Sequence, residues 1–409
     1  MSWAQWAEGK NAKTRARGRW RELRNFDALG LRGTMSDGRR VVAFAANDYL
    51  GLSCHPQVMA AAHEAIDRWG TGAGAARLIS GSRPVHAELE TQLAEWKGTE
   101  SALVFPSGFA ANLGVLSALA GPGTLICSDE LNHASIIDGC RLARGSGATI
   151  AVYPHAGAGA VAELLAKREA GQRAVVVTDS VFSMDGDAAP VAALAEICRH
   201  HGALLVLDEA HAVLGPHPGD LGCELLRVGT LSKALGSQGG FVTGPRVIIE
   251  MLVNRCRPFI FTTALAPANA AAALAALRVV RSGEGDGLLA RLAGYVARVA
   301  PGRTVPSPIV PFVVGSEEAA VRLSRSLLDI GLLVPAVRPP TVPPGTSRLR
   351  VALSAAHTDD EVGMLLAALE RLEPLGPAGY RRRTDVDDRV AGPPDAVHAL
   401  DDSNNFVAD

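Results

Sequence analysis

Asp208 and Lys233 stand 25 positions apart, and both occupy places in the sequence where side chains do chemistry. Ala203 to Leu207 is a short apolar run that predicts a buried strand, so we expect Asp208 at the end of this strand and His211 just beyond it. In open α/β sheets, ligands bind at that edge. Lys233 lies between small hydroxyl residues and a Gly-rich segment, where it can approach a carbonyl-bearing cofactor. A carboxylate for a pyridinium nitrogen and a lysine for a Schiff base are what pyridoxal phosphate requires.

Two other interpretations of this segment need weighing. The run LVLDEAH also resembles the metal-binding segment of a helicase-type ATPase, but such an enzyme needs an upstream GxxxxGK[ST] loop, and the sequence contains none. A lone lysine near glycines is usually a solvated surface residue. The assignment of Lys233 therefore depends on the other motifs, and we expect no metal ion.

Composition limits the class of protein. The 409 residues are 48% hydrophobic, so the chain can bury a large core and should divide into at least two domains. A net charge of −2 and a pI near 6.6 give no reason to expect a nucleic-acid partner. Basic residues do crowd the stretch from Lys10 to Arg24, either as a solvated helix face, which is the default, or as a rim that attracts anions.

Cysteines and apolar runs indicate the compartment. The six cysteines contain no CxxC pair, which fits a reducing cytoplasm. The segment MSWAQWAEGKNAKTR has no apolar core of the signal-peptide type, and no uncharged apolar run reaches the ~18 residues of a membrane span. We therefore expect a cytoplasmic protein without membrane segments.

The pattern along the chain predicts an α/β fold. Residues before about Asn47 read as a helical arm followed by a hairpin from Gly30 to Phe44, with Ser36-Asp37-Gly38 as its turn. Apolar runs then alternate with Ala/Leu-rich helical stretches, which predicts a mainly parallel sheet with helices on both faces. The expected strands are Ala102 to Phe105, Thr124 to Cys127, Thr149 to Tyr153, Ala174 to Thr178, Ala203 to Leu207 and Gly240 to Thr243.

A smaller α+β domain is expected after the Ala-rich helix Ala266 to Val280. Its predicted elements are strands at Ile309 to Val314 and Arg348 to Leu353, and helices at Glu318 to Ile330 and Asp359 to Leu372. After Gly376 the sequence is charged and punctuated by Pro and Gly, which indicates a disordered tail. The predicted divisions are an arm and hairpin at 1–46, a large cofactor-binding domain at 47–275, a small domain at 276–375 and a tail at 376–409.

Pyridoxal phosphate needs several kinds of protein group, and the first two have candidates in loops. Ser107, Gly108 and Phe109 follow a predicted strand and open a helix, where backbone amides and the helix dipole capture phosphate. Taken alone, this segment is an ordinary strand-to-helix turn. His133, in the segment LNHAS, is a candidate to stack on the cofactor ring, although a lone loop histidine is more often structural.

The remaining groups address the ring and the aldehyde. Asp208 supplies the anion that keeps the ring nitrogen protonated. His211 and Ser183 are candidates to donate hydrogen bonds to the ring hydroxylate, and for Ser183 turn chemistry is the competing explanation. Lys233 completes the set, with the Thr230 hydroxyl offered to the phosphate.

Taken together, these segments resemble a known family. NDYLGLSCHP, GTGAGAARLISGSRPVHAELE, FPSGFAAN, LNHASIIDG, VFSMDGDAAP, LDEAH, GTLSK and RPPTVPPGTSRLRVALSAAH occur in unbroken order. They resemble the α-oxoamine synthases, which are fold-type I pyridoxal-phosphate enzymes, over roughly residues 1 to 375. The resemblance implies an acyltransferase that joins an amino acid to an acyl thioester with loss of carbon dioxide. A non-catalytic binding protein of the same fold is disfavoured, because the cofactor residues are all present.

The resemblance also implies substrates and their contacts. NDYLGLS and RPPTVPPGTSRLRV are most similar to members that join L-alanine to a pimeloyl thioester, carried by coenzyme A or by an acyl-carrier protein. Sister enzymes that use glycine or serine with other acyl-CoA substrates share nearly every cofactor residue. By the family pattern, Arg21 and Thr341 contact substrate and Arg350 holds the amino-acid carboxylate in a bidentate fork. Arg19 and Arg24 are alternatives to Arg21.

Catalysis and assembly follow from the same resemblance. Lys233 would take the proton from the amino-acid α carbon, and His133 would hydrogen-bond the acyl carbonyl besides stacking on the ring. Members of the family are homodimers with the site at the interface. Thr262 or Thr263 in the segment FIFTTALAP would then reach the phosphate in the partner subunit.

Overall fold

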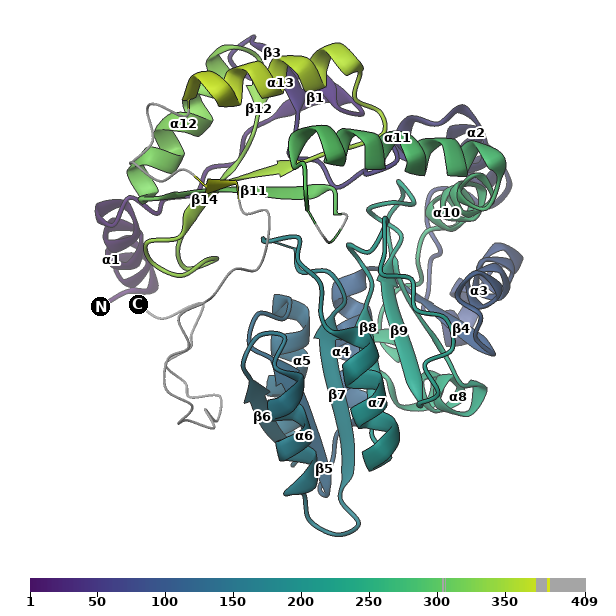
Figure 1. The fold of residues 1–409 in the computed structure, drawn as a ribbon. Coiled ribbons are helices and arrows are strands. Elements are labelled where there is room, and N and C mark those ends of the chain that lie inside the picture. Colours follow the sequence, from purple (N-terminus) through teal and green to yellow (C-terminus); the bar gives the residue numbers. More distant parts are fainter. Residues whose placement is uncertain (304, 306, 373–380, 383–409) are drawn as a thin grey trace.

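The computed structural model describes residues 1–303, 305, 307–372 and 381–382. Most of the expected tail, 376–409, lies outside these residues. The described part forms two bodies, a larger one built on a seven-stranded sheet and a smaller one that stands over one edge of it (Figure 1).

The large body contains the mainly parallel sheet that the alternating pattern predicts, and all six expected strands are confirmed. Its strand order is β4-β10-β9-β8-β7-β5-β6, and only β10 runs antiparallel, to both β4 and β9. The strands are β4 Ser101–Phe105, β5 Thr124–Asp129, β6 Thr149–Tyr153, β7 Arg173–Asp179, β8 Leu204–Asp208, β9 Leu225–Thr230 and β10 Gly240–Gly244. The sequence interpretation missed β9, because the charged Arg227 interrupts its apolar run.

Helices cover both faces of this sheet, because alternate residues of each strand point to opposite sides. Leu204 and Val206 of β8 belong to the core beneath α4, α5 and α8, whereas Leu205 and Leu207 pack on the side of α6 and α7. The helices α2, α3 and α10 form the core with β4 and β10. The bounds are α2 Pro56–Trp69, α3 Pro84–Lys97, α4 Gly108–Leu119, α5 Ala134–Gly145, α6 Ala158–Ala166, α7 Val191–His201, α8 Arg246–Arg255, α9 Arg257–Ile260 and α10 Pro267–Val280, with short helical turns η1 Leu52–Cys54 and η2 Arg77–Gly81.

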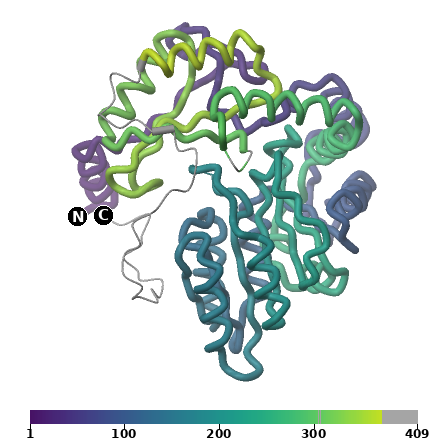
Figure 2. The backbone as a smooth tube through the Cα atoms, in the orientation of Figure 1, coloured from purple at the N-terminus to yellow at the C-terminus, as the bar shows by residue number. Residues whose placement is uncertain are grey.

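The small body combines both ends of the described chain, as Figure 2 shows by the meeting of purple and yellow-green segments. The predicted hairpin forms between β2 and β3, and Gly38 in its turn has a φ of 84°. A two-residue strand, β12, pairs in parallel with β3. The elements are α1 Trp3–Ala16, β1 Phe26–Leu29, β2 Arg32–Met35, β3 Arg40–Ala43, α11 Gly283–Val299, β11 Ile309–Gly315, α12 Glu317–Asp329, β12 Leu332–Leu333, β13 Ala336–Val337, β14 Ser347–Ala352, α13 Asp359–Leu372 and β15 Arg381–Arg382.

Two details add to the domain division expected from the sequence. The expected boundary at residue 275 falls inside α10, so we propose the boundary at Arg281–Ser282, where this helix ends. In the expected tail, Arg381–Arg382 form the strand β15 beside β11.

The parallel strands place several polar residues at one edge. Asp129, Asp179, Asp208 and Thr230 end β5, β7, β8 and β9, and Asp179 is paired in register with Asp208. Because the carboxyl ends of parallel strands lie together, this edge is where a ligand site is expected. Within the described residues, the structure contains no helix that is both long and apolar enough to cross a bilayer.

Candidate active site

A cavity of about 170 Å³ lies at the carboxyl edge of the large sheet. Eight of the residues proposed from the sequence line it: Ser107, Gly108, Phe109, His133, Asp208, His211, Thr230 and Lys233. They come from the starts of α4 and α5, from the ends of β8 and β9, and from the segments that follow these two strands. The fold thus brings together side chains that are up to 126 positions apart, from Ser107 to Lys233.

Asp208 is held in one orientation. Its Oδ2 accepts a hydrogen bond from Asn112 Nδ2 at 2.6 Å, and its Oδ1 accepts one from the amide of Ala210 at 2.9 Å. The Asn112 amide group also donates to Ser135 Oγ at 2.9 Å. The carboxylate is therefore fixed between α4 and the segment after β8. Only 5% of Asp208 is exposed.

Lys233 has the electrostatics of a reactive amine. Burial lowers its pKa, while the nearby carboxylates of Asp208 and Asp179 act in the opposite direction and Arg350 adds to the lowering. A lowered pKa increases the fraction of neutral amine at neutral pH, and only the neutral amine can attack a carbonyl or accept a proton.

His133 begins α5 and is oriented by both its backbone and its ring. Its amide donates to Asp179 Oδ2 at 2.8 Å, and its Nδ1 accepts from the amide of Ser135 at 3.2 Å. The neutral ring therefore carries its proton on Nε2. Burial lowers the pKa of His133, which favours this neutral form. The ring of Phe109 lies 6.3 Å away, edge to face.

His211 is held from the other side by Tyr49. The Tyr49 hydroxyl lies 2.6 Å from His211 Nδ1 and also donates to Asn47 Oδ1 at 3.1 Å. Burial lowers the pKa of His211 far below its usual value and raises the pKa of Tyr49 to about 12, so both side chains are neutral. His211 thus lines the cavity as a neutral hydrogen-bonding group.

The start of α4 is suited to hold an anion, and we propose it as an anion cradle. The Ser107 hydroxyl accepts from the amide of Ala110 at 3.1 Å, and the first amides of a helix have no carbonyl partner within it. Strand β10 passes so close that a Cβ at Gly240 would lie 2.5 Å from Gly108 Cα. Thr230, whose hydroxyl is 2.7 Å from that of Ser232, completes the cradle.

Arg350 enters the region from β14 of the small body. Its Nε donates to the carbonyl of Ser183 at 2.8 Å, and its terminal nitrogens lie 3.4 Å from Asn47 Oδ1. The positive charge of Arg350 acts on the site, because it helps to lower the pKa values of Lys233 and His211. Ser183 therefore adjoins the site through its backbone, and its side chain does not line the 170 Å³ cavity.

Four other proposed residues lie away from this cavity within the single chain. Arg21 is exposed in the segment after α1, and Thr341 is exposed in a turn whose amide donates to Arg338 O. Thr262 and Thr263 follow α9, outside the cavity lining. Of the alternatives to Arg21, Arg19 pairs with Glu317 at 3.2 Å.

The cavity also contains residues that the sequence interpretation missed, namely Asn112, Ser135, Asp179 and Ser232. Asp179 had a usable signal, because it ends an apolar strand just as Asp208 does. Asn112 lies one turn inside α4 and Ser135 lies just inside α5, so only the packing of these helices against each other reveals them.

Residues 39–369 match the family model for aminotransferase class I and II, and the chain belongs to this family. Its fold is that of the fold-type I pyridoxal-phosphate transferases. A structure of a serine palmitoyltransferase variant from S. paucimobilis, with a bound aldimine of pyridoxal phosphate and myriocin, is 29% identical, with a TM-score of 0.83 over 90% of this chain and 97% of that one.

Relatives of one activity are similar over nearly the whole chain. The protein named 8-amino-7-oxononanoate synthase from Anaeromyxobacter dehalogenans is 49% identical over 395 residues, covering 88% of this chain and 97% of the relative. A solved 8-amino-7-oxononanoate synthase from Francisella tularensis is 26% identical, with a TM-score of 0.67 over 82% of this chain and 98% of that one.

The cofactor of this enzyme is pyridoxal phosphate, and the cavity fits it. The fit rests on the chemistry of the donors: a buried lysine with a lowered pKa, an oriented strand-end carboxylate, and a helix start kept open by Gly240. We propose that Ser107, Gly108, Phe109 and Thr230 hold the phosphate, that Asp208, His133 and His211 hold the ring, and that Lys233 binds the aldehyde carbon.

Proposed function

We propose that the chain catalyses the decarboxylative condensation of L-alanine with a pimeloyl thioester to give 8-amino-7-oxononanoate, a step of biotin biosynthesis. The observation that carries this proposal is the 49% identity to a synthase of that name across 97% of its length. The cavity supports it, because pyridoxal-phosphate chemistry needs an amine, a carboxylate and an anion site, and Lys233, Asp208 and the anion cradle supply these three groups.

The cofactor, when bound, supplies an aldehyde and an electron-accepting ring. Asp208 keeps the ring nitrogen protonated, and Lys233 in its neutral form takes the proton from the alanine α carbon. The α carbon then forms a bond to the thioester carbonyl carbon, and the thiol carrier leaves. The original alanine carboxylate departs as carbon dioxide, and a proton replaces it on the α carbon.

Substrate contacts divide between the two bodies. Arg350 holds the alanine carboxylate, since its guanidinium faces the site from β14 while its Nε is fixed by Ser183 O. The Nε2–H of His133 donates to the acyl carbonyl as negative charge develops there. Arg21 and Thr341 contact substrate in this proposal, as the family pattern implies. The basic segment from Lys10 to Arg24 attracts the phosphate-bearing carrier, either coenzyme A or an acyl-carrier protein.

The active enzyme is a homodimer in this proposal. Thr262 and Thr263 lie outside the cavity of their own chain, so the proposal assigns them to the phosphate in the partner subunit. Large apolar side chains of the neighbouring segments support this assembly, because Ile79 is 80% exposed and Phe261 is 70% exposed.

A sister activity is the second candidate, since a serine palmitoyltransferase structure aligns with a TM-score of 0.83. The deciding experiment offers the holoenzyme alanine, glycine and serine in turn, each with pimeloyl-CoA and palmitoyl-CoA. The proposal expects the highest kcat/KM for alanine with pimeloyl-CoA. A higher kcat/KM for serine or glycine would assign the chain to the sister activity.

A variant tests the role of the lysine in the same assay. Lys233→Ala should lose the absorbance of the Schiff base between lysine and cofactor and reduce kcat by several orders of magnitude, because no other amine lines the cavity in the described residues. Lys167→Ala, at the exposed end of α6, is the matched control and should keep both. Retention of activity in Lys233→Ala would refute the assignment.

A further inference from the structure

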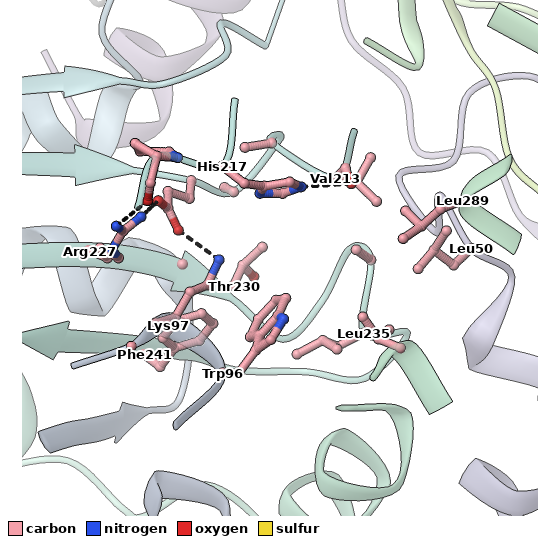
Figure 3. Close-up of a pocket in the computed structure, with 18 of the residues that line it drawn as sticks. Leu50, Trp96, Lys97, Val213, His217, Arg227, Thr230, Leu235, Phe241 and Leu289 are labelled. Carbon is pink, nitrogen blue, oxygen red and sulfur yellow. Dashed lines mark hydrogen bonds and ion pairs between the residues drawn. The ribbon is translucent and has the colours of Figure 1, made fainter. Parts of the chain in front are cut away.

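A second and larger cavity lies behind β9. It has a volume of about 490 Å³, within the range of small-molecule sites. The end of α3, the segment after β8, strands β9 and β10, and residues of α10 and α11 enclose it. Figure 3 shows a charged end with Lys97 and Arg227 and an apolar end with Leu50, Leu235 and Leu289.

The charged end has more positive than negative charge. Glu209 Oε2 lies 2.7 Å from Lys97 Nζ, and Glu209 Oε1 accepts from Arg227 Nη1 at 2.6 Å. All three side chains are at least 90% buried, with exposures of 10%, 2% and 7% for Lys97, Glu209 and Arg227. Two cations thus share one carboxylate, which leaves one buried positive charge.

Lys97 has capacity for another acceptor. An ammonium group has three N–H donors. Within the described part of the chain, the Glu209 carboxylate is the only oxygen acceptor of Lys97 Nζ. Arg227, by contrast, also donates to the carbonyls of Pro218 and Gly219, at 2.5 and 3.1 Å. An anionic group in the cavity would therefore be bound through Lys97.

The other titratable groups of the lining do not neutralise the remaining positive charge of Lys97 and Arg227. Glu95 is half exposed and lies 3.5 Å from Arg281, on the outer side of the cavity. Burial, followed by the charge of Lys97, lowers the pKa of His217, which is therefore neutral at pH 7.

The apolar end fits a hydrocarbon chain or ring. Trp96 and Phe241 have ring centroids 6.5 Å apart, and Lys97 Nζ lies 4.0 Å from the Trp96 ring. The wall continues from these rings to Leu235 and Leu289. An occupant with one anionic head and an apolar body would complement both ends.

The second cavity adjoins the cofactor site. Ala210, Gly229 and Thr230 line both cavities, and Ala234 and Leu235 of the second cavity directly follow Lys233. The wall between them is tightly packed, because a Cβ at Gly229 would lie 2.4 Å from the Phe241 ring. An occupant would therefore press on the segment that positions Lys233.

We propose that this cavity is an effector site that binds a small amphipathic monocarboxylate, with the carboxylate on Lys97 and the apolar body against Trp96, Phe241 and Leu235. Binding in this cavity shifts the position of the Lys233 side chain through Ala234 and Leu235. The site is separate from the proposed amino-acid site, because Arg350 does not line this cavity.

The test measures binding of sodium octanoate to the holoenzyme by calorimetry, in the presence of saturating alanine. Octanoate should bind, and its binding should shift the visible absorbance of the cofactor. Lys97→Met should weaken binding by about tenfold or more, since a hydrogen bond to a charged group is lost, whereas Lys97→Arg should retain it. Glu209 keeps Arg227 as its partner in either variant.

A second variant and a neutral ligand separate the contributions of the two ends of the cavity. Leu289→Trp fills the apolar end and should weaken octanoate binding without touching the charged end. Octanol should bind at least tenfold more weakly than octanoate. The proposal is overturned if octanoate does not bind at millimolar concentration, if it competes with alanine, or if Lys97→Met binds it as well as the unmodified enzyme does.

Discussion

Asn112 is the side chain that most directly orients the carboxylate in the cofactor site. It is 2% exposed, and its Nδ2 bridges Asp208 Oδ2 at 2.6 Å and Ser135 Oγ at 2.9 Å. Such a bridge fixes the carboxylate without adding charge, so Asp208 keeps its full attraction for a protonated ring nitrogen. Asn112 acts through Asp208 and is a positioning residue.

Replacing Asn112 by alanine should therefore reduce turnover without unfolding the protein. Loss of a hydrogen bond to a charged group costs about 1.5–3 kcal/mol, which corresponds to a fall in kcat of about tenfold or more. Steady-state kinetics at saturating substrate measures this effect. Ser117→Ala in the same helix is the control, because the Ser117 hydroxyl donates to Gly114 O within that helix. An unchanged kcat in Asn112→Ala would contradict the positioning role.

Among single residues, those that could be predicted from the sequence lie where a predicted strand or helix begins or ends, or beside a Gly-rich segment. Asp208 ends an apolar run, Ser107 precedes a helix, and Lys233 lies beside glycines. Asn112 carried no such mark, because its contact with Asp208 spans 96 positions and exists only once α4 packs over β8. The substrate contact of Arg21 stays a prediction from the family pattern, because Arg21 is exposed and the group proposed to contact it is the substrate.

At the scale of elements, the sheet edge is tied together by His155, just after β6. Its Nδ1 lies 3.1 Å from Asp129 Oδ1 at the end of β5, and its Nε2 lies 2.8 Å from Asp187 Oδ2. Asp187 belongs to the loop that also carries Ser183, whose carbonyl fixes Arg350. His155 thus connects two strand ends with the loop beside the substrate site. The sequence predicted the strands and the loop separately. The contacts of His155 with Asp129 and Asp187 could be found only from the folded structure.

This connection should make stability depend on pH. Burial alone would lower the pKa of His155, but its hydrogen bonds to Asp129 and Asp187 outweigh burial and raise that pKa to about 9. The unfolded pKa is about 6.5, so the stabilisation is complete below pH 6.5 and is lost as pH rises through 9. Its size is on the order of 3 kcal/mol.

Denaturant unfolding at pH 6, 7.5 and 9.5 measures the effect. The free energy of unfolding lost in His155→Gln should be greatest at pH 6 and smallest at pH 9.5. His200→Gln, at the exposed end of α7, should show no such trend. A loss in His155→Gln that is equal at all three pH values would mean that His155 is neutral in the folded protein.

At the scale of the whole molecule, the small body is built from segments that are remote in sequence. β3 pairs with β12, although about 290 residues separate them, and Arg338 Nη1 donates to the carbonyl of Gly18 at 2.9 Å. Strands of two residues carry too little pattern to be predicted, so neither β12 nor β13 could be located from the sequence. The α/β class was predictable, because most of the buried parallel strands are continuous runs of mainly apolar residues.

Assembly of two chains would bury an exposed apolar surface near the cofactor site. This surface gathers around η2 and α9, which contact each other: Leu78 and Ile79 lie in η2, and Phe261 directly follows α9. Helix α9 also packs against α4, whose first residues line the cofactor cavity. In a homodimer that shares its sites through Thr262 and Thr263, this surface lies at the interface. Phe261→Asp should then shift the enzyme from dimer to monomer in sedimentation and reduce kcat by about tenfold or more, since a charged side chain would replace a large apolar one at the interface. Val247→Asp, on α8 and 71% exposed, places the same charge elsewhere and should leave the dimer and kcat intact. An unmodified enzyme that is monomeric and fully active would rule out a shared site, and Thr262 and Thr263 would then have no phosphate to reach.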